Sequence, residues 1–366
     1  MWQFIGLSTD TKPTQEENKK VADGVLFYET DTSKLFVFFR GTWYEHTSTG
    51  GGPGYYAGKD LADTYTIGQL SEKVQSGDFS GINIGDYITK TVKVGNNQER
   101  ELDFVVAGFD YFYGMGDTET TAHHIIMVPD TAFYEQMKMN DSNTTVGGYY
   151  GSLAHGIASA AYTAGSGGSL TSVSCDYERF LNSNLGSENG TYEFSYASSG
   201  KWEYNSTAVG SNLDDYGVKY TGTPVTGDTI TVTFAKGNLE PYRQAIYTAF
   251  GEDHVLTHRV YTTTSSSSGT WCDARVELLN ESMAYGHTIR ANNILGDSYA
   301  KAQLPLFVNE PNRAASVKRG KDGSRSSAWL SSISSSATFC SISNYSSAYG
   351  SNASNSLAVR PYFLFV

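Results

Sequence analysis

Residues 326–356 read SSAWLSSISSSATFCSISNYSSAYGSNASNS, and this stretch decides how the fold is interpreted. It holds 14 serines in 31 residues and no charged residue, a composition that usually indicates disorder. Large apolar residues nevertheless recur through and just beyond it at the spacing of strand residues: Trp329, Leu330, Ile333, Phe339, Ile342, Leu357 and Val359. Strands that are anchored in a core and carry short polar loops explain both features.

The same stretch predicts a binding surface. Serine, asparagine and tyrosine combine flexible hydrogen bonding with rigid aromatic area at a low cost in entropy, which is typical of adaptable binding surfaces. The candidates for ligand contact are Ser332, Ser334, Ser336, Phe339, Ser341, Ser343, Tyr345, Tyr349, Asn352 and Asn355. Because successive strand residues point to opposite faces, we expect about half of them to face outward. The alternative is a serine-rich solvent face without a ligand.

Composition excludes several classes of protein. Lys and Arg total 26 against 38 Asp and Glu, a net charge of -12, whereas nucleic-acid binding requires clustered basic residues. The densest apolar run, residues 35–39, is far shorter than the ~18 residues that span a bilayer. We therefore expect no nucleic-acid partner and no membrane insertion. The first residues lack the basic region and the apolar run of a secretory signal, and three cysteines give no disulfide framework, so we expect synthesis in a cytoplasm. An aromatic content of 13% excludes global disorder.

The first candidate domain covers residues 1–46. Two β-rich runs flank residues 29–34, and a third short run follows Gly41, which predicts a small β module. It resembles a short N-terminal module common in phage tail proteins, of the form F-Y-E-x-D-T-x-K-x-Y-x-x-x-G-x-W. The matching residues are Phe27, Tyr28, Glu29, Asp31, Thr32, Lys34, Gly41 and Trp43. The resemblance implies a virion anchor, and the Gly-rich residues 47–58 predict a linker.

The remaining chain is predicted to be one domain in two parts, residues 59–164 and 237–366, interrupted by a small β domain at residues 165–236. The first part is expected to hold a short helix within residues 61–74 and several strands. The insertion alternates in strand fashion around Gly, Asp and Pro turns. Its runs DYGV at 215–218 and GDTITV at 227–232 resemble a small β module that recurs in phage tail proteins.

The two flanking parts carry a series of motifs. They are ARVELLNESMAYG at 274–286, QLPLF at 303–307, SAWLSS at 327–332 and AVRPYFL at 358–364. The series resembles a C-type-lectin-like family of Firmicutes and phage proteins, whose hallmarks are E-x-E-x-Y-G, F-P-L-F, W-W-L-R-S and a terminal G-V-R-P-A-F. Ala328 and Ser331 depart from the third hallmark. The resemblance implies an α+β, mostly β fold, a C-type-lectin-like domain with an inserted small β domain and a short N-terminal β module.

The resemblance also implies a hypothesis for residues 326–356. In this family the C-terminal segment can be the variable region of diversity-generating retroelements, in which adenines of the gene are mutagenised. Codons such as AAC would then yield Asn, Ser, Tyr, Thr, Ile, Gly and Ala, much as the segment contains. Substitutions spread evenly over the whole chain in sister isolates would contradict this hypothesis.

Histidine pairs give only weak signals of metal binding. His123 and His124 are adjacent, so in a strand they would point to opposite faces and could not easily share one metal. His254 and His258 are spaced as on one face of a helix, where a zinc pair is conceivable. Without further ligands we favour ordinary hydrogen-bonded or surface histidines, and we predict neither a metal nor another cofactor.

Catalytic patterns are equally weak. Glu277 and Glu281 would lie on one face of a helix and could suggest glycoside hydrolysis, but the resemblance places them in structural packing. No strand–elbow–helix serine motif is present. We predict that the chain is not an enzyme, and a surface-glycan hydrolase is the weaker alternative.

The predicted function is that of a phage virion tail or fibre-tip protein, or a prophage relative, that binds a bacterial surface receptor, either a glycan or a protein. Individually weak contacts give strong overall binding when several copies bind together. A trimer is expected by analogy with such fibres. The protein would be made in the host cytoplasm and would join other virion proteins through residues 1–46. The alternative is a structural virion protein, a capsid decoration or tail ornament, whose lectin-like domain makes assembly contacts.

Overall fold

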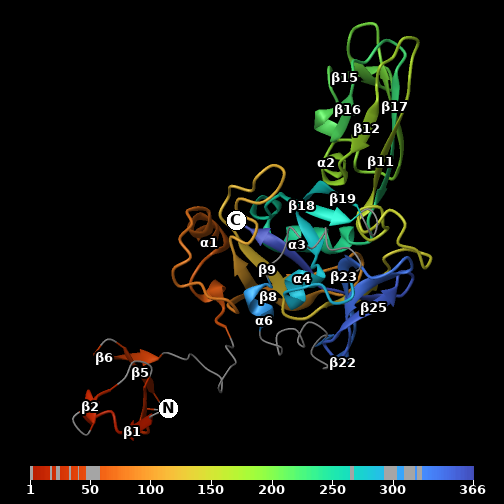
Figure 1. The fold of residues 1–366 in the computed structure, drawn as a ribbon. Helices are drawn as coiled ribbons and strands as arrows, with labels where there is room; N and C mark the ends of the chain where they lie inside the picture. The colour runs from red at the N-terminus through yellow and green to blue at the C-terminus, as the bar shows by residue number, and fades with distance from the viewer. Residues whose placement is uncertain are drawn as a thin grey trace. The chain divides into compact units, whose positions relative to one another are not determined.

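The computed structural model describes residues 3–16, 19–21, 25–32, 34–39, 41–46, 58–263, 268–291, 303–308, 318–319 and 324–366. The chain divides into two compact units, Met1–Gly58 and Lys59–Val366. Strands hold 39% of the residues and helices 14%, which confirms the expected α+β, mostly β class (Figure 1). Within the described ranges, no helix has the length and apolar character needed to cross a membrane.

The N-terminal unit is built on a four-stranded sheet with the order β1-β4-β5-β6. Its strands are β1 (Gln3–Gly6), β4 (Leu26–Glu29), β5 (Leu35–Phe39) and β6 (Thr42–His46), beside a pair β2 (Gln15–Glu16) and β3 (Lys19–Lys20). The last three strands of the sheet are antiparallel, as their runs predict, and β1 adds a parallel strand. The ring of Trp43 packs edge-on against Phe38 with centroids 5.1 Å apart, which holds β5 and β6 together.

The second unit contains a central antiparallel sheet with the order β20-β27-β9-β8-β7. Its strands are β7 (Tyr87–Val92), β8 (Arg100–Phe109), β9 (Ile125–Pro129), β20 (Val276–Leu278) and β27 (Pro361–Phe365). The helices of this unit include α1 (Ile67–Gln75), α3 (Glu240–Phe250), α4 (Glu281–Tyr285) and α6 (Pro305–Val308). Helix α3 packs against β7 and α6 against β8.

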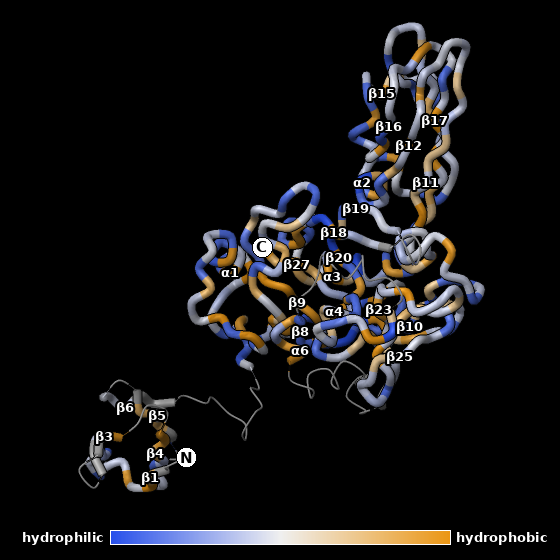
Figure 2. Tube along the Cα trace, in the orientation of Figure 1, coloured by the Kyte–Doolittle hydropathy of each residue, from blue (hydrophilic) through white to orange (hydrophobic). Residues whose placement is uncertain are grey.

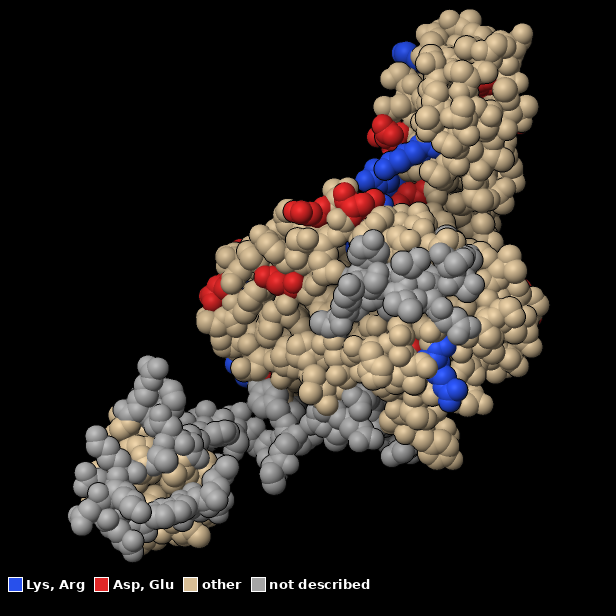
Figure 3. Space-filling model, viewed as in Figure 1, with Lys and Arg blue, Asp and Glu red and all other residues tan. Residues whose placement is uncertain are grey.

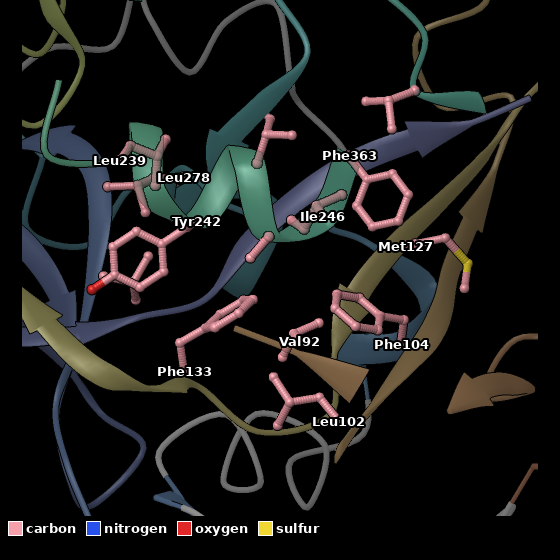
Figure 4. Close-up of a cluster of buried hydrophobic side chains, with 14 of the residues drawn as sticks. Val92, Leu102, Phe104, Met127, Phe133, Leu239, Tyr242, Ile246, Leu278 and Phe363 are labelled. Carbon is pink, nitrogen blue, oxygen red and sulfur yellow. The ribbon is translucent and has the colours of Figure 1, made fainter. Parts of the chain in front are cut away.

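Both faces of the central sheet are buried. Ile125 and Met127 of β9 enter a main cluster with α3, whereas Ile126 and Val128 enter a second cluster with α4 and α6. Figure 4 shows part of the main cluster, and Figure 2 shows the hydrophobic stretches of β8 and β9 in the interior. A strand covered on both faces is apolar at every position, which explains the continuous run IIMVP.

A second five-stranded sheet has the order β10-β26-β23-β24-β25. Its strands are β10 (Phe133–Met137), β23 (Ala328–Ile333), β24 (Thr338–Ile342), β25 (Ala348–Asn352) and β26 (Leu357–Val359). The serine-rich stretch thus forms strands, as its apolar spacing predicts. Its anchors Trp329, Leu330 and Phe339 are at most 1% exposed.

The helix expected within residues 61–74 is shorter than predicted. Asp60 caps a single 3-10 turn, η1 (Leu61–Asp63), and Thr66 then caps α1. The side chain of Thr66 accepts from the backbone of Gln69, whose side chain accepts from Thr66 in return. This capping box fixes the start of the helix at Ile67, six residues later than the apolar spacing suggests.

The segment around residues 156–236 has its own core. One sheet has the order β11-β17-β13-β14-β15, with β11 (Gly156–Thr163), β13 (Gly190–Tyr196), β14 (Trp202–Tyr204), β15 (Thr207–Gly210) and β17 (Thr229–Lys236). Beside it lie β12 (Ser172–Cys175), β16 (Val218–Thr221), α2 (Tyr177–Leu181) and the 3-10 turn η2 (Asp214–Tyr216). Phe194, Trp202 and Phe234 fill its cluster. Strand β11 begins nine residues before the predicted boundary at residue 165.

One further hairpin completes the described part of the second unit at the base of that segment. It consists of β18 (His258–Thr263) and β19 (Gly269–Ala274). The short strands β21 (Lys318–Arg319) and β22 (Ser324–Arg325) form a separate antiparallel pair. Helix α2 packs against β19. Figure 3 shows acidic and basic residues gathered in this region.

Candidate functional site

Half of the predicted contact residues are exposed on the β24–β25 hairpin and the turns next to it. Tyr345 is 79% exposed and Tyr349 is 56% exposed, unusually high values for tyrosine. Ser336, Asn352 and Asn355 are also exposed, and Ser334 is half-buried. We call Ser336, Tyr345, Tyr349, Asn352 and Asn355 the hairpin surface.

Four predicted contact residues are buried and leave the candidate set. Phe339 lies in the main cluster with no exposed area. Ser332 Oγ accepts a hydrogen bond from the backbone N–H of Glu281 at 3.0 Å, and Ser341 Oγ lies 2.9 Å from Ser351 Oγ. Ser343 is 8% exposed and bonds within its own turn. The polar groups of these serines are satisfied inside the protein.

The reason for this burial is that β24 is covered on both faces. Phe339 enters the main cluster, whereas Cys340 and Ile342 enter the second cluster. Successive side chains of β24 therefore point alternately into the two clusters, and neither face of the strand points to solvent. Within residues 326–356, the exposed side chains lie on the edge strand β25 and in the turns.

The turn that carries Tyr345 is held by hydrogen bonds. Ser343 Oγ accepts from the backbone N–H groups of Tyr345 and Ser347, and Ser346 adopts a positive φ of 67°. Tyr285 Oη donates to the carbonyl oxygen of Ser346 at 3.1 Å. The exposed ring of Tyr345 therefore projects from a turn whose backbone is held by the side chains of Ser343 and Tyr285.

A loop far away in sequence borders the hairpin surface. Thr145 donates from its backbone N–H to the carbonyl of Ser336 at 3.0 Å, and Asn143 Oδ1 accepts from Ser354 Oγ at 2.6 Å. Val146, the residue after Thr145, is 82% exposed. These contacts join residues about 190 to 211 positions apart, so no local pattern could have predicted them.

The hairpin surface has no charge of its own. Residues 326–356 include no Asp, Glu, Lys, Arg or His. Its chemistry is that of hydroxyl and amide hydrogen bonding beside two aromatic rings. Such a surface suits neutral or weakly polar partners, and salt should screen its contacts very little.

The histidines have structural partners. His123 Nδ1 lies 2.7 Å from Asp110 Oδ2, and His124 Nδ1 lies 2.9 Å from the carbonyl oxygen of Ala122. His254 belongs to the short η3 turn (Glu252–His254), while His258 starts β18, so the two do not share a helix face. Among the residues that the structure describes, no group of three potential ligands could hold a metal ion.

The two glutamates also differ from the expected arrangement. Glu277 lies on β20 and Glu281 begins α4, so they are not neighbours on one helix. Glu277 accepts a hydrogen bond from Tyr149 Oη at 2.6 Å, deep in the core. Glu281 accepts from the backbone N–H groups of residues 289–291 at 2.7–3.0 Å. Both carboxylates are committed to internal contacts, as the packing role implies.

Comparison with other proteins gives no family for this chain. No protein family matches it, and no curated protein and no solved structure is significantly similar to it. The function of this chain is therefore inferred from the residues and geometry of the hairpin surface.

Proposed function

We propose that this chain is a phage virion tail or fibre-tip protein that binds a bacterial surface receptor through the hairpin surface. The observation that carries the proposal is the exposure of Tyr345 and Tyr349 on an uncharged, Ser- and Asn-rich hairpin whose apolar residues Phe339, Cys340 and Ile342 are packed into two cores. Tyrosine supplies contact area at little entropic cost, and the surrounding hydroxyl and amide groups supply hydrogen bonds. A rigid base reduces the cost of ordering the surface on binding.

The fold assigned in this proposal is a C-type-lectin-like domain formed by residues 59–164 and 237–366. Two residues of its motif series make buried links to distant strands, which supports their role in defining a fold. Trp329 Nε1 donates to the carbonyl oxygen of Met137 at 2.8 Å, and Arg360 Nε donates to that of Pro129 at 2.6 Å. The N-terminal unit serves as the virion anchor, residues 326–356 are a variable region, and the assembled form is a trimer.

One observation favours the alternative, a structural virion protein. Strand β25 is the edge of its sheet, and it carries neither a charged residue nor a proline that would oppose pairing with another strand. In that case β25 would add to a strand of a neighbouring virion protein, with backbone hydrogen bonds in place of tyrosine contacts.

A binding assay separates the two functions. Labelled protein is mixed with a panel of Firmicutes cells beside the double variant Tyr345→Ala, Tyr349→Ala, and Tyr113→Ala serves as a control because Tyr113 is 46% exposed outside the hairpin. Attachment requires binding by the native protein and the control, with at least a tenfold loss in the folded double variant. No binding to any strain, with normal incorporation into virions, would exclude the attachment role in favour of the structural one.

A further inference from the structure

A pocket with a cavity volume of about 340 Å³ lies at the end of the main cluster, between β7, β8 and β10. Its apolar floor includes Val92, Leu102 and Phe133, which are at most 8% exposed as residues and lie side by side in Figure 4. The volume falls within the range of about 300–1,000 Å³ typical of small-molecule sites. Because β10 and β25 are opposite edges of their sheet, the pocket is distinct from the hairpin surface, with which it shares no residue.

An arginine with an unusual environment lines this pocket. The guanidinium carbon of Arg100 lies 3.6 Å from the centre of the Tyr134 ring, so the charged group is stacked on the ring. Its Nε is buried and has no hydrogen-bond partner among the residues described. Stacking fixes the guanidinium plane in advance, which lowers the entropic cost of any hydrogen bond it donates.

The polar groups of the pocket define the chemistry of its occupant. Arg100 can only donate hydrogen bonds, Glu101 and Glu135 can only accept them when ionised, and Gln98 can do both. One guanidinium and two carboxylates leave the lining with a charge of -1, which disfavours an anion. A hydroxyl group both donates and accepts, so a polyhydroxylated neutral ligand matches this mixed set.

We propose that this pocket binds a neutral mono- or disaccharide, with hydroxyl groups between Arg100 and Glu135 and the C–H face of a sugar ring on the apolar floor. The competing explanation is that Arg100 only shields the end of the core from water, with no ligand. A sugar added to the protein should bind in the pocket under the first explanation and should not bind there under the second. The inference does not depend on the proposed attachment role, since it concerns other residues.

The test is saturation-transfer-difference NMR on the full chain. The probes are methyl β-glucoside, methyl β-galactoside, methyl α-rhamnoside, N-acetylglucosamine and cellobiose, with N-acetylneuraminic acid and galacturonate as anionic comparators. We expect transfer to ring C–H protons of at least one neutral probe and weaker transfer to both anions. Absence of transfer to every neutral probe, or stronger transfer to an anion, would overturn the proposal.

Variants locate the signal in the pocket. We expect Arg100→Met to weaken binding of the responding probe at least tenfold, while Arg290→Met, at an exposed site, leaves it unchanged. Where circular dichroism shows that Arg100→Met is misfolded, Glu135→Gln replaces it, since it keeps the shape, removes the charge and replaces one of the two acceptor oxygens with a donor. Full binding by the pocket variant contradicts the proposal, and so does loss of binding in the Tyr345→Ala, Tyr349→Ala variant, because the sugar would then occupy the hairpin surface.

Discussion

Arg259 Nη1 lies 2.7 Å from Asp273 Oδ1 across the β18–β19 hairpin. The same guanidinium contacts Asp117 through Nε at 2.7 Å and Asp176, the N-cap of α2, through Nη1 at 3.4 Å. Arg179 of α2 adds an ion pair to Asp273 at 2.6 Å. One arginine thus contacts three carboxylates at the point where α2 meets the hairpin, and Arg179 adds a second positive charge there. This is the charged region of Figure 3.

The first prediction is that Arg259→Met destabilises the second unit by about 3 kcal/mol, because removing one partner leaves partly buried carboxylates facing one another. Burial and the charge of Asp273 already raise the pKa of Asp176, so this carboxyl is costly to keep ionised. Urea unfolding at neutral pH measures the change. Adding Asp273→Asn should recover part of the loss, since it removes one uncompensated charge. Lys201→Met, at an exposed turn just before β14, is the control.

The second prediction concerns acid. Burial, and secondly the charge of the neighbouring His124, lower the pKa of His258 to about 3. The unfolded chain then binds one more proton than the folded chain between about pH 6.5 and pH 3. This contribution is fully present above pH 6.5 and is lost as the pH falls, at about 1.4 kcal/mol per pH unit.

Substitution isolates that contribution. The variant His258→Gln cannot take up this proton, so its free energy of unfolding should fall less steeply between pH 6 and pH 4 than that of the native protein, by about 1.4 kcal/mol per pH unit. Denaturant unfolding at several pH values gives both slopes. Equal slopes would show that His258 does not titrate differently in the two states.

The third prediction is that Glu281→Ala unfolds the loop that follows α4. Its buried carboxylate accepts from the backbone N–H groups of Ile289, Arg290 and Ala291, and these donors would be left without an acceptor. Bonds to a charged group contribute about 1.5–3 kcal/mol each, so a loss of at least 3 kcal/mol is expected. Glu281→Gln keeps one carbonyl acceptor and should lose less. Thermal unfolding with amide exchange at residues 289–291 measures both effects.

The sequence predicts the strands of this protein better than it predicts which of their faces are exposed. The apolar run at β9 and the spaced anchors Trp329 and Phe339 indicate strands, because large apolar residues must be buried wherever the chain pairs. The same pattern cannot show that β24 separates two cores, since this depends on which distant residues, including those of α4 and α6, join the second cluster. Half of the predicted contact residues are exposed, the proportion that strand alternation suggests, but which half they are depends on the two cores.

Long-range contacts set the remaining limit. Strand β1 pairs in parallel with β4, which leaves no hairpin signal between them. The loop that carries Val146 reaches the hairpin surface through Asn143 and Thr145, whose partners lie near the other end of the chain. The pocket at Arg100 likewise joins β8 to β10, and its stacked arginine becomes visible only once Tyr134 is placed.

The last prediction separates presentation of the hairpin surface from contact with the partner. Ser343 is buried and cannot touch a receptor, yet its hydroxyl accepts from the N–H groups of Tyr345 and Ser347. Ser343→Ala should therefore speed amide exchange at both positions and weaken cell binding several-fold, less than Tyr345→Ala does, while overall stability changes by about 1 kcal/mol. Ser336→Ala, at an exposed site on the same surface, should leave exchange in the turn unchanged. Faster exchange in Ser343→Ala with undiminished binding would show that the receptor does not depend on the position of the Tyr345 ring.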